Sequence, residues 1–227
     1  MSGNHHLYVP GPSNVPAAVQ QAIHCPMEDH RNPTIPDLIS PLVNDLKKIV
    51  LTEKGKMVFF PSSGTGCWEA ALQSTLNVGD TVLGASFGQF SMLWLDMCKR
   101  LQFITITMEE EWGTGANPES YHKELSNDKD HKIKAVLVCQ NETATGVRSD
   151  VLAIRKILDD LNHPALLMVD GVSSVASYEF RMDDWGVDCI VSGSQKGLML
   201  PAGIGILGVS PKAVSYTHLT LPTKRIV

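Results

Sequence analysis

The sequence has 227 residues, of which 43% are hydrophobic and 19% are charged, and its formal net charge is -5. This balance is typical of a globular protein, and a negative net charge gives no attraction to nucleic acid or anionic lipid. No apolar run reaches the ~20 residues of a membrane-spanning helix, and the polar residues 1–6 begin no signal peptide. The five cysteines are scattered and form no C-x-x-C pair, which predicts reduced thiols in an intracellular compartment and no metal site.

Short apolar runs alternate with amphipathic segments along most of the chain. Strands are predicted over residues 57–60, 81–85, 103–108, 133–139, 165–169, 189–192 and 203–209, and helices over residues 68–76, 90–101 and 149–161. In the second of these helices Leu93, Met97 and Leu101 share one face. This alternation predicts an α/β fold, a mostly parallel sheet with helices on both faces. Ligands of such sheets bind at the carboxyl ends of the strands.

The first candidate site is the turn at residues 61–66, between the first strand and its helix. Glycines there let backbone N–H groups close around an anion, and Ser63 and Thr65 can add hydroxyl donors. No lysine follows Gly66, so the turn is not a P-loop, and a dinucleotide fingerprint would need a third glycine. An ordinary strand-to-helix turn with an N-cap is the alternative.

Three further polar residues follow other predicted strands. Asp170 ends the apolar run at 165–169, where it can pair with a protonated pyridine nitrogen or act as a simple cap. Lys196 lies among small residues after the strand at 189–192, where desolvation can lower its pKa and make the amine nucleophilic; a lone lysine there is otherwise solvated. Thr143 follows the strand at 133–139, in what is otherwise an ordinary polar loop. The combination of anion turn, aspartate and lysine favours a cofactor site.

Six segments together resemble the class V aminotransferases of pyridoxal phosphate (PLP) fold type I, in their serine–glyoxylate and alanine–glyoxylate branch. In chain order they are HHLYVPGPSNVP, FFPSSGTGCWEAAL, NETATGVRSD, HPALLMVDGVSS, FRMDDWGVD and GSQKGLMLPAGIG. The resemblance runs from about residue 5 to residue 214. It implies the large domain of that fold, with PLP as the cofactor.

The resemblance also implies two catalytic residues, Lys196 as the Schiff-base lysine and Asp170 as the partner of the pyridine nitrogen. The other implied cofactor contacts surround the phosphate (Ser63, Gly64, Thr65 and Gln195), the phenolic oxygen (Thr143) and the ring (Val172, and Phe87 by stacking). Gly11 and Pro12 match an N-terminal segment that approaches the substrate side.

The domain organisation expected from the resemblance is an N-terminal arm over residues 1–30 and an incomplete PLP-binding large domain over residues 31–214. Residues 215–227 resemble a translated sequencing-adapter tail and are predicted to be non-native. Relatives continue past residue 214 into a small C-terminal domain, which supplies the arginine that grips the substrate carboxylate. Without it, the chain as written is expected to lack turnover.

The implied reaction is transamination from L-serine, or L-alanine, to glyoxylate, giving glycine and hydroxypyruvate, or pyruvate. Another class V member, such as an aminoethylphosphonate transaminase, is the nearest alternative, and a non-catalytic PLP-binding fragment is the alternative from another class. A nicotinamide dehydrogenase is disfavoured by the missing glycine, and a desulfurase by Gln195, where that branch usually has histidine. A homodimer is expected for the full-length protein. The expected location is the peroxisome, with a role in photorespiration, if the source is a photosynthetic eukaryote, and otherwise the cytoplasm.

Overall fold

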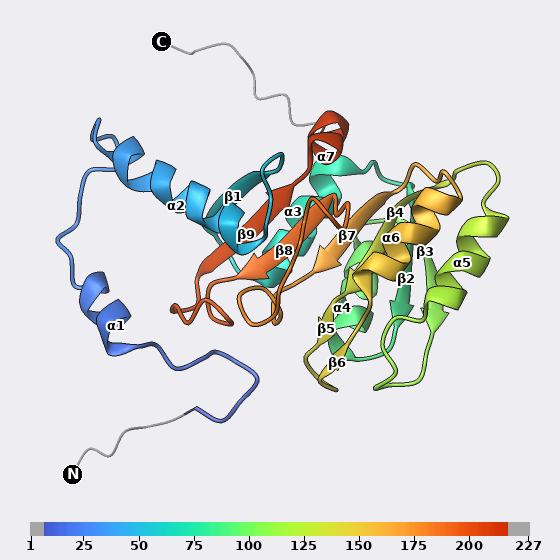
Figure 1. Ribbon diagram of the computed structural model, residues 1–227, viewed down its shortest axis with the longest axis horizontal. Coiled ribbons are helices and arrows are strands. Elements are labelled where there is room, and N and C mark those ends of the chain that lie inside the picture. Colours follow the sequence, from blue (N-terminus) through green and yellow to red (C-terminus); the bar gives the residue numbers. More distant parts are fainter. Residues whose placement is uncertain (1–6, 218–227) are drawn as a thin grey trace.

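The computed structural model describes residues 7–217 and shows an α/β fold built on one large sheet (Figure 1). Seven strands form this sheet in the order β1-β9-β8-β7-β4-β2-β3. Their bounds are β1 (Lys56–Pro61), β2 (Thr81–Ser86), β3 (Ile104–Glu109), β4 (Ile133–Cys139), β7 (Leu166–Asp170), β8 (Cys189–Gly193) and β9 (Ile204–Val209). Strands β3, β2, β4, β7 and β8 are parallel, whereas β9 runs antiparallel to both β8 and β1. The predicted mostly parallel sheet is confirmed.

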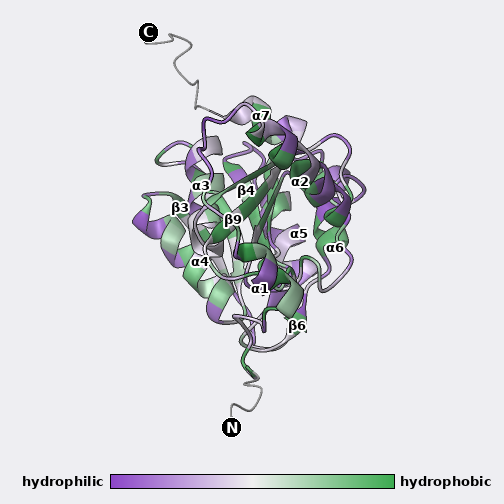
Figure 2. Ribbon diagram, turned by 90° about the vertical axis from the view of Figure 1, so that its left-hand side faces the viewer, coloured by the Kyte–Doolittle hydropathy of each residue, from purple (hydrophilic) through white to green (hydrophobic). Residues whose placement is uncertain are grey.

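Helices cover both faces of the sheet, as Figure 2 shows in side view. One face carries α3 (Gly64–Thr75), α4 (Gln89–Arg100) and α7 (Pro211–Tyr216), and the other carries α2 (Ile35–Ile49), α5 (Pro118–Asn127) and α6 (Val151–Asp160). Each face has its own hydrophobic cluster, and the central strands β4 and β7 are buried between the two. Their almost continuous apolar sequence follows from this burial on both sides.

Two smaller features border the carboxyl ends of the parallel strands. A hairpin of β5 (Asn141–Glu142) and β6 (Val147–Arg148) directly follows β4. The N-terminal arm, with α1 (Ala17–Ile23), runs past the same edge in Figure 1 and buries no residue of its helix. Ser215 and Tyr216 of the predicted tail close α7, and residues 218–227 lie outside the described residues.

Several predicted elements differ from the structure. Helix α3 begins at Gly64, four residues before the predicted start, and the two glycines of its first turn have close neighbours that leave no room for a side chain. Of the predicted apolar face of α4, Met97 and Leu101 pack partly buried against the core, but Leu93 is 40% exposed, and the fully buried positions are Ser91, Trp94, Leu95 and Cys98. The helices α1, α2, α5 and α7 and the β5–β6 hairpin were not predicted, and neither was the reversed direction of β9.

Candidate active site

Asp170 is the last residue of β7 and lies at the carboxyl edge of the sheet, only 4% exposed. The backbone N–H of Val172 donates to its Oδ1 at 2.8 Å, and the Cys139 thiol on the neighbouring strand lies 3.7 Å from its Oδ2. The indole N–H of Trp68 lies near the same carboxyl, and within the described residues it has no partner at hydrogen-bond distance. A buried carboxyl therefore sits at the end of the sheet with few donors of its own.

This burial raises the pKa of Asp170 to about 6. Hydrogen bonds from Val172 and Cys139 and the nearby Trp68 indole oppose the effect, while the charge of Glu142 adds to it. A carboxylate in low dielectric is costly unless a cation pairs with it. Asp170 is thus suited to a positively charged partner, which is what a protonated pyridine nitrogen provides.

Lys196 lies in the loop that connects β8 to β9, one strand over from Asp170. Its Nζ donates to the carbonyl oxygen of Pro10 in the N-terminal arm. Partial burial lowers the pKa of Lys196, and attraction to Asp170 opposes this shift. The amine is therefore held near the buried carboxyl in a setting that favours its neutral, nucleophilic form.

The N-terminal arm is fastened to the lysine loop. Ser13 donates its N–H to the carbonyl of Gln195 at 2.9 Å and its hydroxyl to that of Lys196 at 3.0 Å. Gly11 has φ +116°, and a Cβ added there would lie 2.5 Å from the Lys196 Nζ. Only glycine fits this approach without strain. Pro12, next to it, is exposed.

The anion turn lies at the amino end of α3. Ser63 is the N-cap residue, and its side chain makes no capping hydrogen bond. An added Cβ on Gly193 would lie 3.0 Å from the Gln195 Oε1 and 3.5 Å from the Gly64 N, so these polar groups converge. The Gln195 Oε1 is buried, and no described residue donates to it. Helix N–H groups, hydroxyls and a glutamine amide form a site of the kind that binds phosphate.

The remaining predicted contacts lie around this edge in different settings. Val172 packs against Gly64, where an added Cβ would meet its Cγ2 at 2.4 Å. Thr143 is half-buried in the turn between β5 and β6. Phe87 follows β2 and is fully buried within the core, so its stacking on a ring stays a prediction.

Three residues near the site were not singled out from the sequence: Trp68, Cys139 and Glu142. Cys139 ends an apolar strand and Trp68 lies in a helix, so both look like ordinary core residues. Glu142 contacts residues about fifty positions earlier in the chain, and no local pattern signals this. Among residues 7–217 no group of three or more His, Cys, Asp or Glu side chains is placed to hold a metal ion, and no helix is long and apolar enough to cross a membrane.

Comparison with known proteins gives the family. Residues 27–224 match the family described as Aminotransferase class-V. The chain belongs to the class V aminotransferases, and the resemblance seen in its sequence is confirmed.

Individual relatives point to one branch of this family. The chain is 58% identical over 214 residues to a serine–glyoxylate aminotransferase from Hyphomicrobium methylovorum, and 51% identical over 222 residues to one from Arabidopsis thaliana. These alignments cover 94% and 98% of this chain but 53% and 55% of the relatives. The chain therefore spans about half the length of the curated relatives it matches.

A solved structure agrees with the fold. The crystal structure of an alanine–glyoxylate aminotransferase from Nostoc sp. superposes with a TM-score of 0.85 at 26% identity. The match covers 95% of this chain and 57% of that one. The N-terminal arm, the sheet and its helices thus have the arrangement found in a class V enzyme.

Proposed function

We propose that this chain is the PLP-binding part of an aminotransferase that transfers the amino group of L-serine to glyoxylate. One observation carries the proposal: the buried Asp170, whose pKa is raised to about 6, lies near enough to Lys196 for its charge to act on the amine, and the neighbouring Gln195 Oε1 has no donor among the described residues. The residues present fit PLP, because they offer a carboxyl for a cationic ring nitrogen, an amine for an aldehyde and N–H groups for a phosphate.

Each residue has a separate task in this proposal. PLP, when bound, supplies the electron sink that makes loss of the Cα proton of an amino acid possible. The Lys196 amine would hold the cofactor covalently and, once released, would serve as the base that takes the Cα proton of the amino acid and delivers it again. Asp170 keeps a proton on the ring nitrogen by pairing with its positive charge. The amino end of α3, with Ser63, Thr65 and Gln195, holds the phosphate.

The choice of substrates rests on the relatives named serine–glyoxylate aminotransferase. With L-serine as donor and glyoxylate as acceptor, the products are hydroxypyruvate and glycine. L-alanine as donor, giving pyruvate, is the second candidate, because the solved structure with the same fold is named for alanine and glyoxylate. An aminoethylphosphonate transaminase remains a further alternative within the family.

The cofactor assignment is tested on the 227-residue chain. The chain is incubated with PLP, reduced with borohydride and mapped by mass spectrometry. The expected result is a single pyridoxyl adduct on Lys196. An adduct spread over exposed lysines, or none at all, would leave the chain without a PLP site and would contradict the proposal.

The donor assignment needs the full-length protein, because the chain spans only half of its relatives. The absorption band of bound PLP is followed while L-serine, L-alanine or 2-aminoethylphosphonate is added, and glycine formation from glyoxylate is then measured. L-serine is expected to convert the band and to support glycine formation fastest. Conversion by L-alanine alone would make L-alanine, and not L-serine, the amino donor. A full-length protein that binds PLP but converts no donor would favour a non-catalytic PLP-binding protein.

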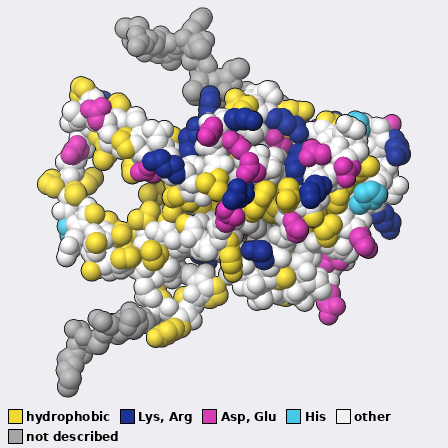
Figure 3. All heavy atoms as spheres, in the orientation of Figure 1, with side chains coloured by type: hydrophobic (Ala, Val, Ile, Leu, Met, Phe, Trp, Pro, Cys, Tyr) yellow, Lys and Arg dark blue, Asp and Glu magenta, His cyan; other side chains and the backbone are white. Residues whose placement is uncertain are grey.

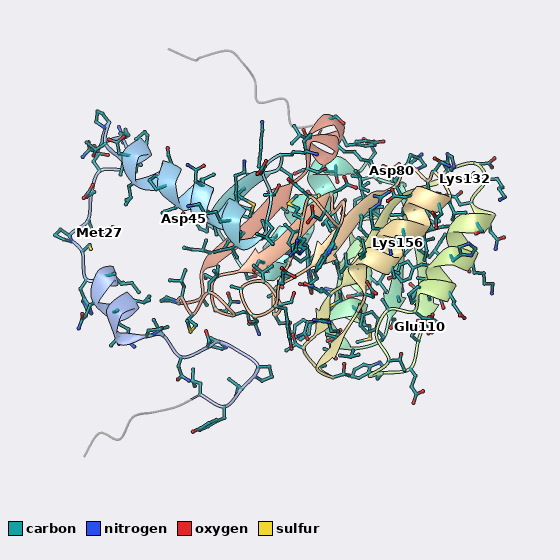
Figure 4. The ribbon with its side chains drawn as sticks, in the orientation of Figure 1. Met27, Asp45, Asp80, Glu110, Lys132 and Lys156 are labelled. Carbon is teal, nitrogen blue, oxygen red and sulfur yellow. The ribbon has the colours of Figure 1, made fainter. Side chains whose placement is uncertain are left out.

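The proposed assembly of the full-length protein is a homodimer. The N-terminal arm and α2 expose apolar side chains, which appear as yellow groups over α1 and α2 in Figure 3, and Met27 of the arm points away from the body in Figure 4. The exposed members are Leu7, Tyr8, Val9, Ile23, Met27, Leu38 and Leu42. Apolar surface of this extent is typical of a protein interface. Sedimentation of the full-length protein at twice the monomer mass is expected; a monomer would contradict the assembly.

The proposed location depends on the source of the gene. In a photosynthetic eukaryote we propose a peroxisomal enzyme of photorespiration, and in a bacterium a cytoplasmic one. A fluorescent fusion that leaves both ends of the full-length protein free tests this, and accumulation outside the cell or in another organelle would contradict it.

A further inference from the structure

Glu142, the second residue of β5, has a carboxylate that is buried without a cation. Its side chain is 0% exposed, and among the described residues no Lys, Arg or His forms an ion pair with it. Burying a charge in this way is costly unless strong hydrogen bonds replace the lost water. The residue therefore needs a structural or functional reason for its place.

The hydrogen bonds to Glu142 come from two separate segments. The N–H groups of Phe90 and Ser91, in the first turn of α4, donate to its Oε2 at 3.0 and 2.9 Å. The N–H of Ala144, in the β5–β6 turn, donates to its Oε1 at 3.1 Å. A negative charge at the amino end of a helix is also favoured by the helix dipole. One carboxylate thus replaces the N-cap of α4 and fastens a distant turn to it.

The N-cap position of α4 leaves room for the side chain of Glu142. Gly88 occupies that position and supplies no capping side chain. An added Cβ on Gly88 would lie 2.2 Å from the Glu142 Cγ. A larger residue at 88 would displace Glu142, so the glycine and the glutamate fit together as a pair.

Both fastened segments carry predicted cofactor contacts. On one side, the Ser91 hydroxyl accepts from the N–H of Phe87 at 3.1 Å, so the first turn of α4 fixes the backbone of that aromatic residue. On the other side, Ala144 directly follows Thr143. Glu142 therefore lies between the residue expected on the ring face and the residue expected at the phenolic oxygen.

We propose that Glu142 is a positioning residue, which ties the Phe87 and Thr143 segments together and so sets how the cofactor ring is held. The inference rests on the proposed function for its link to PLP. The tie itself, between the amino end of α4 and the β5–β6 turn, is a property of the chain without cofactor. It can therefore be measured separately.

The test compares Glu142→Gln with wild type by amide hydrogen exchange in the 227-residue chain. A glutamine keeps the size of the side chain, but its amide nitrogen cannot accept a hydrogen bond from an N–H, so its one oxygen can serve only one of the two segments. Exchange is expected to accelerate roughly tenfold or more in at least one of the two segments, either at residues 90 and 91 or at residue 144. Glu111→Gln, an exposed glutamate elsewhere, is the matched control and is expected to change neither segment.

Two exchange results would overturn the tie. One is acceleration in neither segment. The other applies even if Glu142→Gln does not fold: wild-type amides at 90, 91 and 144 that exchange as fast as unprotected ones would show that no such bonds exist. Gly88→Ala would displace the whole Glu142 carboxylate and is therefore expected to accelerate exchange in both segments.

A spectroscopic readout links the tie to the cofactor. Glu142→Gln is expected to keep the reducible Lys196–PLP bond but to lose about half or more of the visible circular dichroism per bound cofactor, with PLP affinity about tenfold lower. Wild-type dichroism and affinity in this variant would overturn the positioning role alone. A wild-type chain that binds no PLP would overturn the proposed function, and the link to the cofactor with it, whatever the exchange data show.

Discussion

The two ends of the central sheet differ in how far the chain satisfies Asp128 and Asp188 at one end and Asp170 at the other. At the amino ends of the parallel strands, near α7 in Figure 1, Asp128 accepts hydrogen bonds from the N–H groups of Lys132 and Ile133 and lies 3.2 Å from the His163 Nε2. Asp188, at the same edge, accepts from the N–H of Leu167 and the hydroxyl of Ser210. These carboxylates are fully hydrogen-bonded by the chain itself.

At the carboxyl ends the chain leaves polar groups short of partners. Asp170 accepts one backbone N–H, while the Trp68 Nε1 and the Gln195 Oε1 are buried without a partner among the described residues. The pKa values differ accordingly. Burial raises that of Asp170 to about 6, whereas burial of Asp128 is outweighed by its hydrogen bonds and its pKa is lowered. At this edge the buried polar groups left without partners fit a ligand site, whereas satisfied carboxylates such as Asp188 and Glu142 hold the fold in position.

Replacing Lys196 should have the largest effect on PLP binding at the carboxyl edge of the sheet. Lys196→Ala removes the only amine expected to bond to PLP, so the borohydride-reducible adduct should disappear completely. Lys156→Ala, on the exposed face of α6 in Figure 4, is the matched control and should leave the adduct unchanged. A mapped adduct at the same level in both variants would place the cofactor elsewhere.

Substitutions at the two ends of α3 test whether the turn at its amino end binds the phosphate of PLP. Thr65→Val removes a hydroxyl expected on a charged phosphate, which should weaken PLP binding by roughly tenfold to a hundredfold. Ser74→Ala, near the other end of the same helix, should leave the affinity within about twofold, since nothing at that end faces the site. Titration of PLP by absorbance measures both. Equal losses in the two variants would indicate a general effect on α3 and no phosphate site.

A smaller effect is expected at two glycines that share a positive φ but differ in their surroundings. Gly113 has φ +93° with nothing close to an added Cβ, whereas at Gly11 the added Cβ would meet the Lys196 Nζ. Alanine should cost each backbone about 1 kcal/mol. Only Gly11→Ala should also displace the amine, and so slow adduct formation by several-fold in a stopped-flow measurement. Equal rates in the two variants would mean that the arm does not control the lysine.

The sheet and the site edge were predictable because both have local signals. Strand β4 was predicted with its observed bounds, since a strand buried on both faces is a continuous apolar run. Asp170 and Lys196 stood out because each follows such a run. Part of what was missed also had a signal: Asn117 and Pro118 form an N-cap and first turn for α5, and Asn117 accepts from the N–H of Glu119.

Other features depend on residues far apart in the chain. The buried face of α4 is set by which side meets β2, and the spacing of Leu93 and Met97 does not reveal it. Gly88 and Glu142 look like turn residues until the fold brings them into contact. Such long-range pairs leave no period in a single sequence.

The comparison of the two sheet ends predicts that substitutions of Asp170 and Asp128 change the free energy of unfolding in opposite directions. Because burial raises the pKa of Asp170 from 3.8 to about 6, the folded state holds a proton that the unfolded state releases, and stability falls as the pH rises across this range. Removing this charge should stabilise the cofactor-free protein at pH 7 by ~2–3 kcal/mol. Asp128 has a lowered pKa, so its contribution is present at pH 7 and is lost on acidification below the ordinary aspartate range.

The most direct test is therefore thermal unfolding of the cofactor-free chain at pH 7 for Asp170→Asn and Asp128→Asn. Asp170→Asn is expected to raise Tm by several degrees, roughly 2–4 °C per kcal/mol, while its PLP affinity falls. Asp128→Asn is expected to lower Tm by a similar amount. If both substitutions lower Tm equally, Asp170 is a structural carboxylate like Asp128, and the account of a prepared cofactor site at this edge is contradicted.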